Sequence, residues 1–155
     1  MLYSGIFTTL MLLDITIMES ENKRLKSVGL FTATVNTVKD LYKQVDIITK
    51  NEKRPFILFF GSLTESGESW CSDCRNATEP IDEGLKLLPT AISLILCYIG
   101  DRENWKNESN EFRTDSKLAI KSVPTIFDFK NNRRLVNEEI TVDSLNELLN
   151  SDEIK

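Results

Sequence analysis

The chain has 155 residues, with 19 basic and 24 acidic side chains, three cysteines and no histidine. This length fits one compact domain, or one domain with a tail. The net charge of −5 argues against nucleic acid as a partner, because no excess of basic side chains is available to meet phosphates. The absence of histidine excludes imidazole bases, Ser-His-Asp and Cys-His nucleophile arrangements, and mixed Cys/His zinc sites. Chemistry in this chain must therefore use thiols, carboxylates or amines.

The first 18 residues contain an apolar run at residues 6–13, about as long as the core of a signal peptide. No basic residue precedes it and Asp14 follows it, and it is far shorter than the roughly 20 residues that cross a bilayer. Three interpretations stay open: an extension outside the fold, a weak signal sequence, or an added strand. The polar residues 19–26 predict a solvated linker. We therefore assign residues 1–26 to an extension and linker, and residues 27–155 to the domain.

The first half of the domain alternates between strand and helix patterns. The β-rich run at residues 28–35 predicts a strand, and Asn36 or Thr37 can cap a helix after it. That helix repeats apolar residues at helical spacing, namely Val38, Leu41, Tyr42, Val45 and Ile48. The apolar run at residues 55–60 is typical of a central strand buried on both faces of a parallel sheet. A polar loop at residues 61–69 then leads to Trp70 and a pair of cysteines.

Further along, residues 74–88 predict a helix whose inner side chains are Ile81, Leu85 and Leu88. The apolar run at residues 91–99 predicts another buried strand, and Cys97 inside it is interpreted as core packing. A polar stretch at residues 101–117 is expected to be a loop with a helix inside, anchored by Trp105 and Phe112.

The C-terminal part predicts two strands and a helix. Residues 126–129 form one strand, residues 131–134 turn the chain, and Leu135 and Val136 continue an antiparallel partner. Thr141 or Asp143 can cap the last helix, whose inner stripe is Val142, Leu145, Leu148 and Leu149. The order of elements predicts an α/β sheet with a parallel core and an antiparallel C-terminal edge.

The cysteine pair Cys71 and Cys74 lies after the central strand, where a helix is expected to begin. Two thiols one helical turn apart are close enough for a reversible disulfide. The N–H groups and dipole at a helix start stabilise an anion, so we expect a lowered pKa at Cys71 and assign it as the nucleophile. Cys74 would then resolve the mixed disulfide. Trp70 is expected to shield the pair and contact the substrate.

The residues leave two alternatives to redox use. A zinc site is disfavoured because only Cys97 could add a third thiolate and no histidine exists, so we expect no metal. A pair of inert core cysteines is the other alternative. The position of the pair at a strand-to-helix junction, directly after Trp70, favours redox use.

This pattern, with Val123-Pro124-Thr125 ahead of a later strand, resembles the thioredoxin superfamily. Asp73 between the cysteines, the loop GSLTESGESW and the segments LCYIGDRENWKN and NEFR are similar to the thioredoxin domain-containing protein 17 family, over about residues 28–149. The resemblance implies a thioredoxin-like fold, with a mixed central sheet flanked by helices on both faces. It also implies that Cys71 and Cys74 are the redox pair and that Pro124 is a cis-proline facing them.

A cis-proline would expose the backbone of Val123 to an extended substrate, so Val123 and Pro124 are expected in the substrate site. The alternative is a proline that only starts a strand. The resemblance further implies recharging by thioredoxin reductase with electrons from NADPH, no bound cofactor, and cystine or selected protein disulfides as substrates.

Three positions depart from the family pattern. Ser72 stands where the family usually has proline, and Pro80 comes six residues after Cys74 instead of five. Phe59 aligns with the buried aspartate that accepts a proton in ordinary thioredoxins.

The missing carboxylate leaves Asp73 or a water as the expected proton acceptor for Cys74, with Glu79 a weaker candidate. The charge of Asp73 also opposes thiolate formation at Cys71.

The sequence thus favours a cytoplasmic, monomeric disulfide reductase without a nucleic-acid or membrane partner. A redox-inactive adaptor that binds a partner through the thioredoxin-like surface is the alternative. A secretory oxidase or isomerase would require a signal sequence in residues 1–18. It would also place N-glycosylation sequons at Asn76, beside the cysteines, and at Asn107, which favours the cytosol.

Overall fold

The structure is a computed structural model and describes residues 23–151. The apolar run at residues 6–13 and its three interpretations lie outside the described residues. Five strands form one sheet in the order β1-β3-β2-β4-β5. Their bounds are β1 (Phe31–Val35), β2 (Arg54–Phe60), β3 (Ile92–Tyr98), β4 (Thr125–Asp128) and β5 (Arg133–Val136). β3 is parallel to both β1 and β2, whereas β4 is antiparallel to β2 and β5. The predicted parallel core with an antiparallel C-terminal edge is confirmed.

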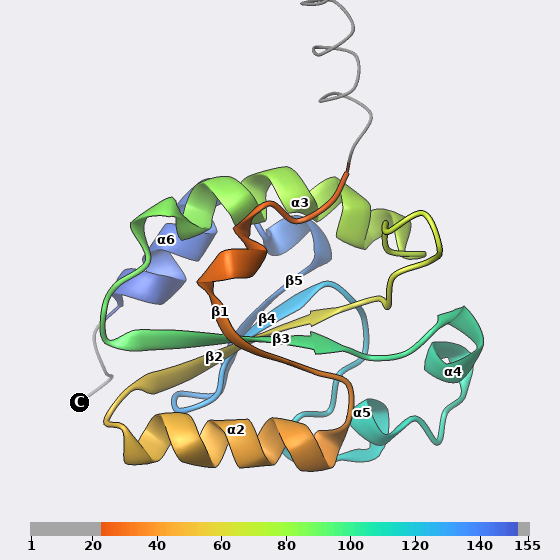
Figure 1. The fold of residues 1–155 in the computed structure, drawn as a ribbon, viewed down its shortest axis with the longest axis horizontal. Helices are drawn as coiled ribbons and strands as arrows, with labels where there is room; N and C mark the ends of the chain where they lie inside the picture. The colour runs from red at the N-terminus through yellow and green to blue at the C-terminus, as the bar shows by residue number, and fades with distance from the viewer. Residues whose placement is uncertain (1–22, 152–155) are drawn as a thin grey trace, which may run out of the picture.

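Helices cover both faces of this sheet (Figure 1). α3 (Ser72–Gly84) and α6 (Val142–Asn150) lie over one face, and α2 (Val38–Lys50) and the short α5 (Glu111–Thr114) lie over the other. A second short helix, α4 (Arg102–Lys106), stands beyond the end of β3, and 3-10 turns cover Ser27–Leu30, Leu85–Leu87 and Asn137–Glu139. The mixed sheet with helices on both faces is the predicted fold class. Among the helices of residues 23–151, none is long and apolar enough to cross a membrane.

α2 and α6 begin where the sequence predicts. The Thr37 hydroxyl accepts a hydrogen bond of 3.1 Å from the Asp40 N–H, and Thr141 accepts one of 3.1 Å from the Ser144 N–H. Each threonine satisfies an N–H that has no partner within its helix. The inner face of α2 buries three of the predicted apolar side chains, Leu41, Val45 and Ile48.

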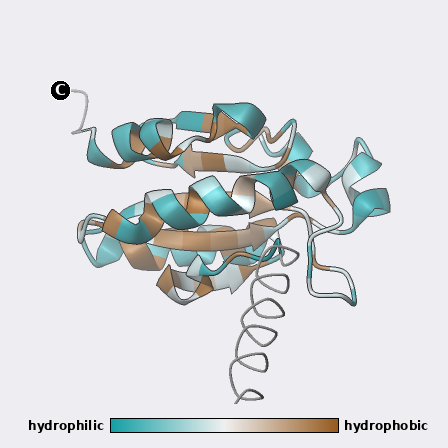
Figure 2. Cartoon of the chain, turned by 90° about the horizontal axis from the view of Figure 1, so that it is seen from above, coloured by the Kyte–Doolittle hydropathy of each residue, from teal (hydrophilic) through white to brown (hydrophobic). Residues whose placement is uncertain are grey.

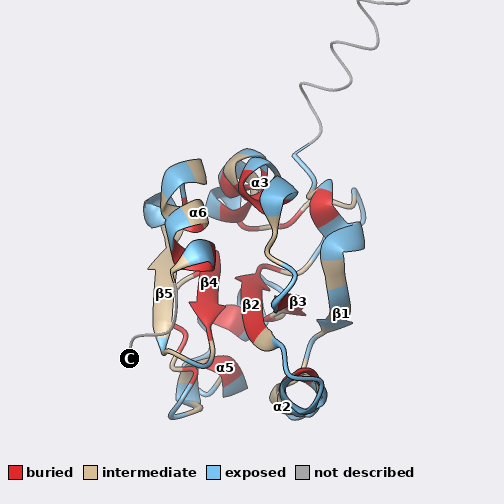
Figure 3. Cartoon of the chain, turned by 90° about the vertical axis from the view of Figure 1, so that its left-hand side faces the viewer, coloured by how far each residue is buried: buried red, intermediate tan, exposed pale blue. Residues whose placement is uncertain are grey.

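The core lies around the middle of the sheet. β2 and β4 are buried along nearly their whole length, and the edge strands β1 and β5 are less covered (Figure 3). Apolar residues follow the strands between the helix layers (Figure 2). Phe59 of β2 packs edge to face against Phe112 of α5, with ring centroids 6.0 Å apart. Cys97 of β3 is opposite Phe59 in the sheet register and is fully buried, as predicted for core packing.

Some predicted boundaries were wrong. Residues 28–30 form a 3-10 turn instead of the start of a strand, because the N–H groups of Lys26 and Ser27 both donate to the Asp82 carboxylate at 2.9 Å and fix the chain against α3. α3 begins at Ser72 and ends at Gly84, where a Cβ would lie 2.6 Å from Leu145. The stretch at residues 101–117 holds two short helices instead of one.

At the end of the sheet where β2 begins, a buried carboxylate holds two arginines. Asp128 accepts hydrogen bonds from Arg54 at 3.1 Å, from Arg133 at 2.8 Å and from the Asn131 amide at 2.9 Å. Burial alone would raise the pKa of Asp128, but the hydrogen bonds from Arg133 and Asn131 and the charge of Arg54 bring it below its ordinary value. This cluster ties β2, β4 and β5 together.

Candidate active site

Cys71 lies where the chain passes from the loop after β2 into α3. Its backbone is extended, and it occupies the N-cap position of the helix. Its sulfur accepts a hydrogen bond of 3.2 Å from the backbone N–H of Cys74. A thiolate can take the place of the usual serine, threonine or aspartate cap, because the first N–H groups of a helix lack partners and point toward an anion. The sequence therefore places a sulfur where the backbone favours negative charge.

The two cysteines differ in exposure. Cys71 is 6% exposed and Cys74 is 0% exposed, and both are free thiols. The Cys71 thiol also donates a hydrogen bond of 3.5 Å to the carbonyl of Val123. Both side chains are therefore buried, and Cys71 is the less buried of the two.

The pKa values of the two thiols move in opposite directions. A hydrogen bond from the Cys74 thiol lowers the pKa of Cys71 to about 7, although burial and the charge of Asp73 act against this. Burial, followed by the hydrogen bond to Cys71, raises the pKa of Cys74 far above its ordinary value. At neutral pH, a large fraction of Cys71 is thus a thiolate while Cys74 keeps its proton.

The predicted substrate residues gather near this sulfur. The Val123–Pro124 peptide bond is cis, as the family resemblance implies, and both residues are buried directly before β4. Trp70 is half-buried; its indole N–H donates to the Gly100 carbonyl at 2.8 Å, and the Arg102 guanidinium lies 5.5 Å from its ring. These contacts hold the indole beside the cysteine pair.

The carboxylates lie on the outside of α3. Asp73 is exposed in the first turn, and its charge acts on Cys71, where it raises the pKa. Glu79 is exposed further along the helix and lines a surface pocket. Phe59, which the family resemblance aligns with the aspartate of ordinary thioredoxins, is a fully buried side chain of the core.

Two residues that sequence reasoning missed lie against the cysteines. The Ser69 hydroxyl donates to the Gly61 carbonyl at 2.7 Å and accepts from the Cys71 N–H at 3.2 Å. The Gly61 N–H in turn donates to the Cys74 sulfur at 3.4 Å. A Cβ on Gly61 would lie 2.7 Å from the Ser69 hydroxyl oxygen and 2.8 Å from Cys71 Cβ, so only glycine fits. Within a loop rich in serine and glycine, neither residue gave a distinguishing signal.

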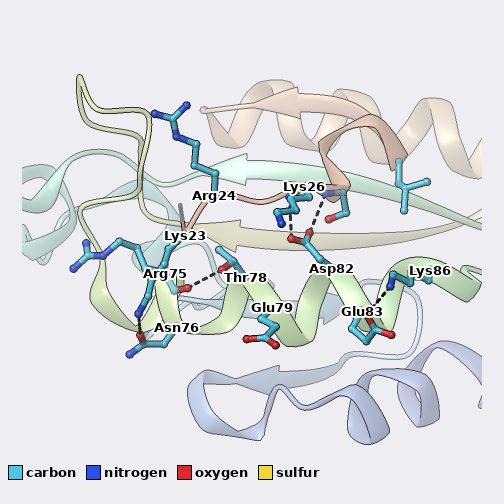
Figure 4. Close-up of a pocket in the computed structure, with 12 residues that line it drawn as sticks. Lys23, Arg24, Lys26, Arg75, Asn76, Thr78, Glu79, Asp82, Glu83 and Lys86 are labelled. Carbon is cyan, nitrogen blue, oxygen red and sulfur yellow. Dashed lines mark hydrogen bonds and ion pairs between the residues drawn. The ribbon is translucent and has the colours of Figure 1, made fainter. Parts of the chain in front are cut away.

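A polar surface pocket of about 790 Å³ lies between α3 and residues 23–30 (Figure 4). Lys23 donates to the Asn76 side-chain carbonyl at 3.2 Å, and Lys86 pairs with Glu83 at 2.7 Å. The last residues of the predicted linker are therefore bonded to α3. Asn76, the first sequon, lies in this wall two residues after Cys74, and Asn107 lies exposed after α4. In residues 23–151, no three cysteine, aspartate or glutamate side chains gather into a group that could hold a metal.

Comparison with known proteins agrees with this geometry. The family described as thioredoxin domain-containing protein 17-like, thioredoxin domain, matches residues 34–152. Thioredoxin domain-containing protein 17 of Mus musculus is 39% identical over 101 residues, which cover 65% of this chain and 80% of the mouse protein. The Homo sapiens protein of that name is 35% identical over 103 residues, covering 66% and 82%. Thioredoxin-like protein Clot of Arabidopsis thaliana is 37% identical over 79 residues, covering 50% and 59%.

These matches confirm the predicted family and its thioredoxin-like fold, and at a general level they support a thiol oxidoreductase. A match over most of the chain, together with a Cys-x-x-Cys pair at the start of α3, shows that the chain belongs to the thioredoxin domain-containing protein 17-like family.

Proposed function

We propose that this chain is a disulfide reductase that uses Cys71 as the nucleophile and Cys74 as the resolving thiol. One observation carries the proposal: Cys71 is the less buried member of the pair, and its sulfur accepts the Cys74 N–H at the start of α3. Hydrogen bonding from the Cys74 thiol brings the pKa of Cys71 to about 7, so the attacking thiolate is available at neutral pH.

The reaction has two exchanges. The Cys71 thiolate attacks one sulfur of the substrate disulfide and forms a mixed disulfide with it, while the substrate S–S bond breaks and the other substrate sulfur leaves with the electron pair and takes a proton. The Cys74 sulfur, after losing its proton, attacks Cys71, and the second substrate sulfur leaves in the same way. The substrate gains two electrons and two protons, and the protein ends with a Cys71–Cys74 disulfide.

The groups around Cys71 support the proposed contacts with substrate. The Val123 carbonyl lies 3.5 Å from the Cys71 sulfur, which supports the proposal that the backbone before cis-Pro124 pairs with an extended peptide. The Trp70 ring offers a flat surface beside the pair. We propose cystine and selected protein disulfides as substrates.

The proton of Cys74 needs an acceptor outside the core. Asp73 is the carboxylate proposed for this role, directly or through a water, because it is exposed in the same helical turn. Glu79 is a weaker candidate, since it lies more than one turn further along α3 and lines the surface pocket.

We further propose that thioredoxin reductase returns the pair to the dithiol with electrons from NADPH, that the chain binds no cofactor of its own, and that it acts as a cytoplasmic monomer. A glycan on Asn76 would stand in the α3 pocket wall beside the cysteine pair, which disfavours the secretory alternative.

The test is an NADPH-coupled assay with thioredoxin reductase and either cystine or insulin as substrate. Wild-type protein should consume NADPH, Cys71→Ser should not, and Cys74→Ser should retain the mixed disulfide. NADPH consumption that persists in Cys71→Ser would refute the assigned nucleophile.

The redox potential of the pair tests the oxidase alternative, and cycling of the pair between dithiol and disulfide tests the adaptor alternative. Reducing thioredoxins have potentials near −270 mV and a strong oxidant has about −120 mV, so a value below about −230 mV would support the reductase. A pair that never cycles in physiological glutathione buffer would instead favour the adaptor.

A further inference from the structure

The second exchange requires negative charge on a sulfur that the fold keeps away from water. Cys74 is 0% exposed, and Phe59, which the family resemblance aligns with the carboxylate of ordinary thioredoxins, is an apolar, fully buried side chain. A buried ion is costly unless hydrogen-bond donors replace the lost water. Cys74 therefore needs donors supplied by the protein itself.

The loop after β2 supplies one such donor, the Gly61 N–H, and a serine hydroxyl is bonded to the same glycine. The Gly61 N–H already donates to the Cys74 sulfur at 3.4 Å. The Ser69 hydroxyl is bonded to the carbonyl of the same glycine at 2.7 Å, and Ser69 is only 2% exposed. Burial has the largest effect on the pKa of Cys74 and raises it, whereas hydrogen bonds from Gly61 and Ser69 act in the opposite direction. Both donors thus favour the charged sulfur.

We propose that Ser69 is a catalytic residue of the second exchange, whose hydroxyl turns from the Gly61 carbonyl to the Cys74 sulfur as that sulfur loses its proton. This inference rests on the proposed reductase function. The hydroxyl stabilises the Cys74 thiolate while it attacks Cys71, and the Cys71–substrate S–S bond breaks as the Cys71–Cys74 bond forms. The proton of Cys74 leaves through Asp73 or water, and the departing substrate thiolate takes up a proton, so Ser69 keeps its own.

The remaining contacts of Ser69 hold its oxygen in place. It accepts the Cys71 N–H at 3.2 Å, and the Arg75 guanidinium donates to the Ser69 carbonyl at 2.7 Å. Gly61 permits the close approach, because a Cβ there would lie 2.7 Å from the Ser69 oxygen. In the structure the hydroxyl donates to the Gly61 carbonyl, and the proposed second exchange requires it to turn toward Cys74.

The test follows the two exchanges separately with Ellman's reagent, a symmetric aromatic disulfide whose released thiolate absorbs visible light. One thiolate is released when Cys71 attacks, and a second when Cys74 resolves the mixed disulfide. Ser69→Ala removes a hydrogen bond to a charged sulfur. It should therefore slow the second release by about tenfold or more and move the pH midpoint of that release upward. The first release should stay within about twofold, because Ser69 accepts rather than donates toward Cys71.

Two further variants make the result specific. Ser69→Thr keeps the hydroxyl and should recover most of the second rate, whereas Ser66→Ala removes a hydroxyl from the exposed part of the same loop and should match wild type. Urea unfolding of each variant shows whether it is folded. The proposal is overturned if folded Ser69→Ala releases the second thiolate at the wild-type rate, or if both releases slow equally. A wild-type chain without a second release would instead refute the reductase function itself.

Discussion

The backbone N–H of Cys74 donates a hydrogen bond of 3.2 Å to the sulfur of Cys71. This contact joins the proposed nucleophile to a helix terminus, because Cys71 is both the N-cap of α3 and the less buried member of the pair. The same turn brings the Cys74 thiol close enough to donate to Cys71, and that hydrogen bond contributes most to lowering the Cys71 pKa. The geometry that prepares the first exchange therefore also holds the resolving thiol ready.

Alkylation of Cys71 should follow a pKa of about 7. The thiolate reacts and the thiol does not, so the rate with iodoacetamide should rise as pH increases through 7 and level off above about 8. In urea, the same cysteine should titrate near its unperturbed pKa of about 8.5. Native and unfolded protein with the same midpoint would show that the fold does not lower the pKa of Cys71.

Asp73→Asn separates two effects of one carboxylate. Its charge raises the pKa of Cys71, so the variant should have a lower alkylation midpoint than wild type. If Asp73 also accepts the Cys74 proton, resolution of the mixed disulfide should slow by about tenfold or more, while the first attack is spared. The two releases of Ellman's reagent measure both steps. Equal effects on the two releases would reject the acceptor role.

Much of this fold can be predicted from periodicity. The run at residues 55–60 is apolar without interruption, and β2 is the middle strand of the sheet. Thr37 and Thr141 mark the helix starts because capping is a local interaction. The error at residues 28–30 has a long-range cause, since the Asp82 carboxylate that fixes this turn lies more than 50 residues away in the chain.

The site could be predicted only in part for a similar reason. Spacing alone identifies Cys71 and Cys74, because one helical turn separates them. Ser69 and Gly61 contact the pair only after the loop has folded back on the end of β2. Their role in the site depends on hydrogen bonds between residues eight and thirteen positions apart. No composition rule distinguishes this serine from Ser62 or Ser66 in the same loop.

Cys97 should not react with thiol reagents in the native protein. It is fully buried in β3, and burial, followed by the charge of Glu111, raises its pKa far above the ordinary value. A timed thiol titration should therefore find Cys71 reacting first and Cys97 only as the protein unfolds. Cys97→Ala should leave both releases of Ellman's reagent unchanged and lower the free energy of unfolding by about 1 kcal/mol. Rapid native labelling of Cys97 would contradict its place in the core.

The stability of the fold at neutral pH should depend on Asp128, which lies far from the redox pair. This fully buried carboxylate accepts from Arg54 and Arg133, and Asp128→Asn leaves both guanidinium groups without their counter-charge. Loss of one partner of a buried ion pair costs about 3 kcal/mol of unfolding free energy, measured by urea unfolding at pH 7. The exposed pair of Asp46 and Lys50 provides the matched control, since Asp46→Asn should cost less than about 1 kcal/mol.

The pH dependence has a defined sign. The pKa of Asp128 is lowered in the folded protein despite its burial, because hydrogen bonds from Arg133 and Asn131 and the charge of Arg54 favour the carboxylate. The unfolded chain therefore takes up this proton first as pH falls, and the stabilisation present above about pH 4 is lost as pH drops through the folded pKa. Wild type should lose unfolding free energy between pH 4 and lower values, and Asp128→Asn should lose less. Because Asp128 pairs with Phe56 near the start of β2, the variant should keep both releases of Ellman's reagent, and slower release would show that this cluster also shapes the distant site.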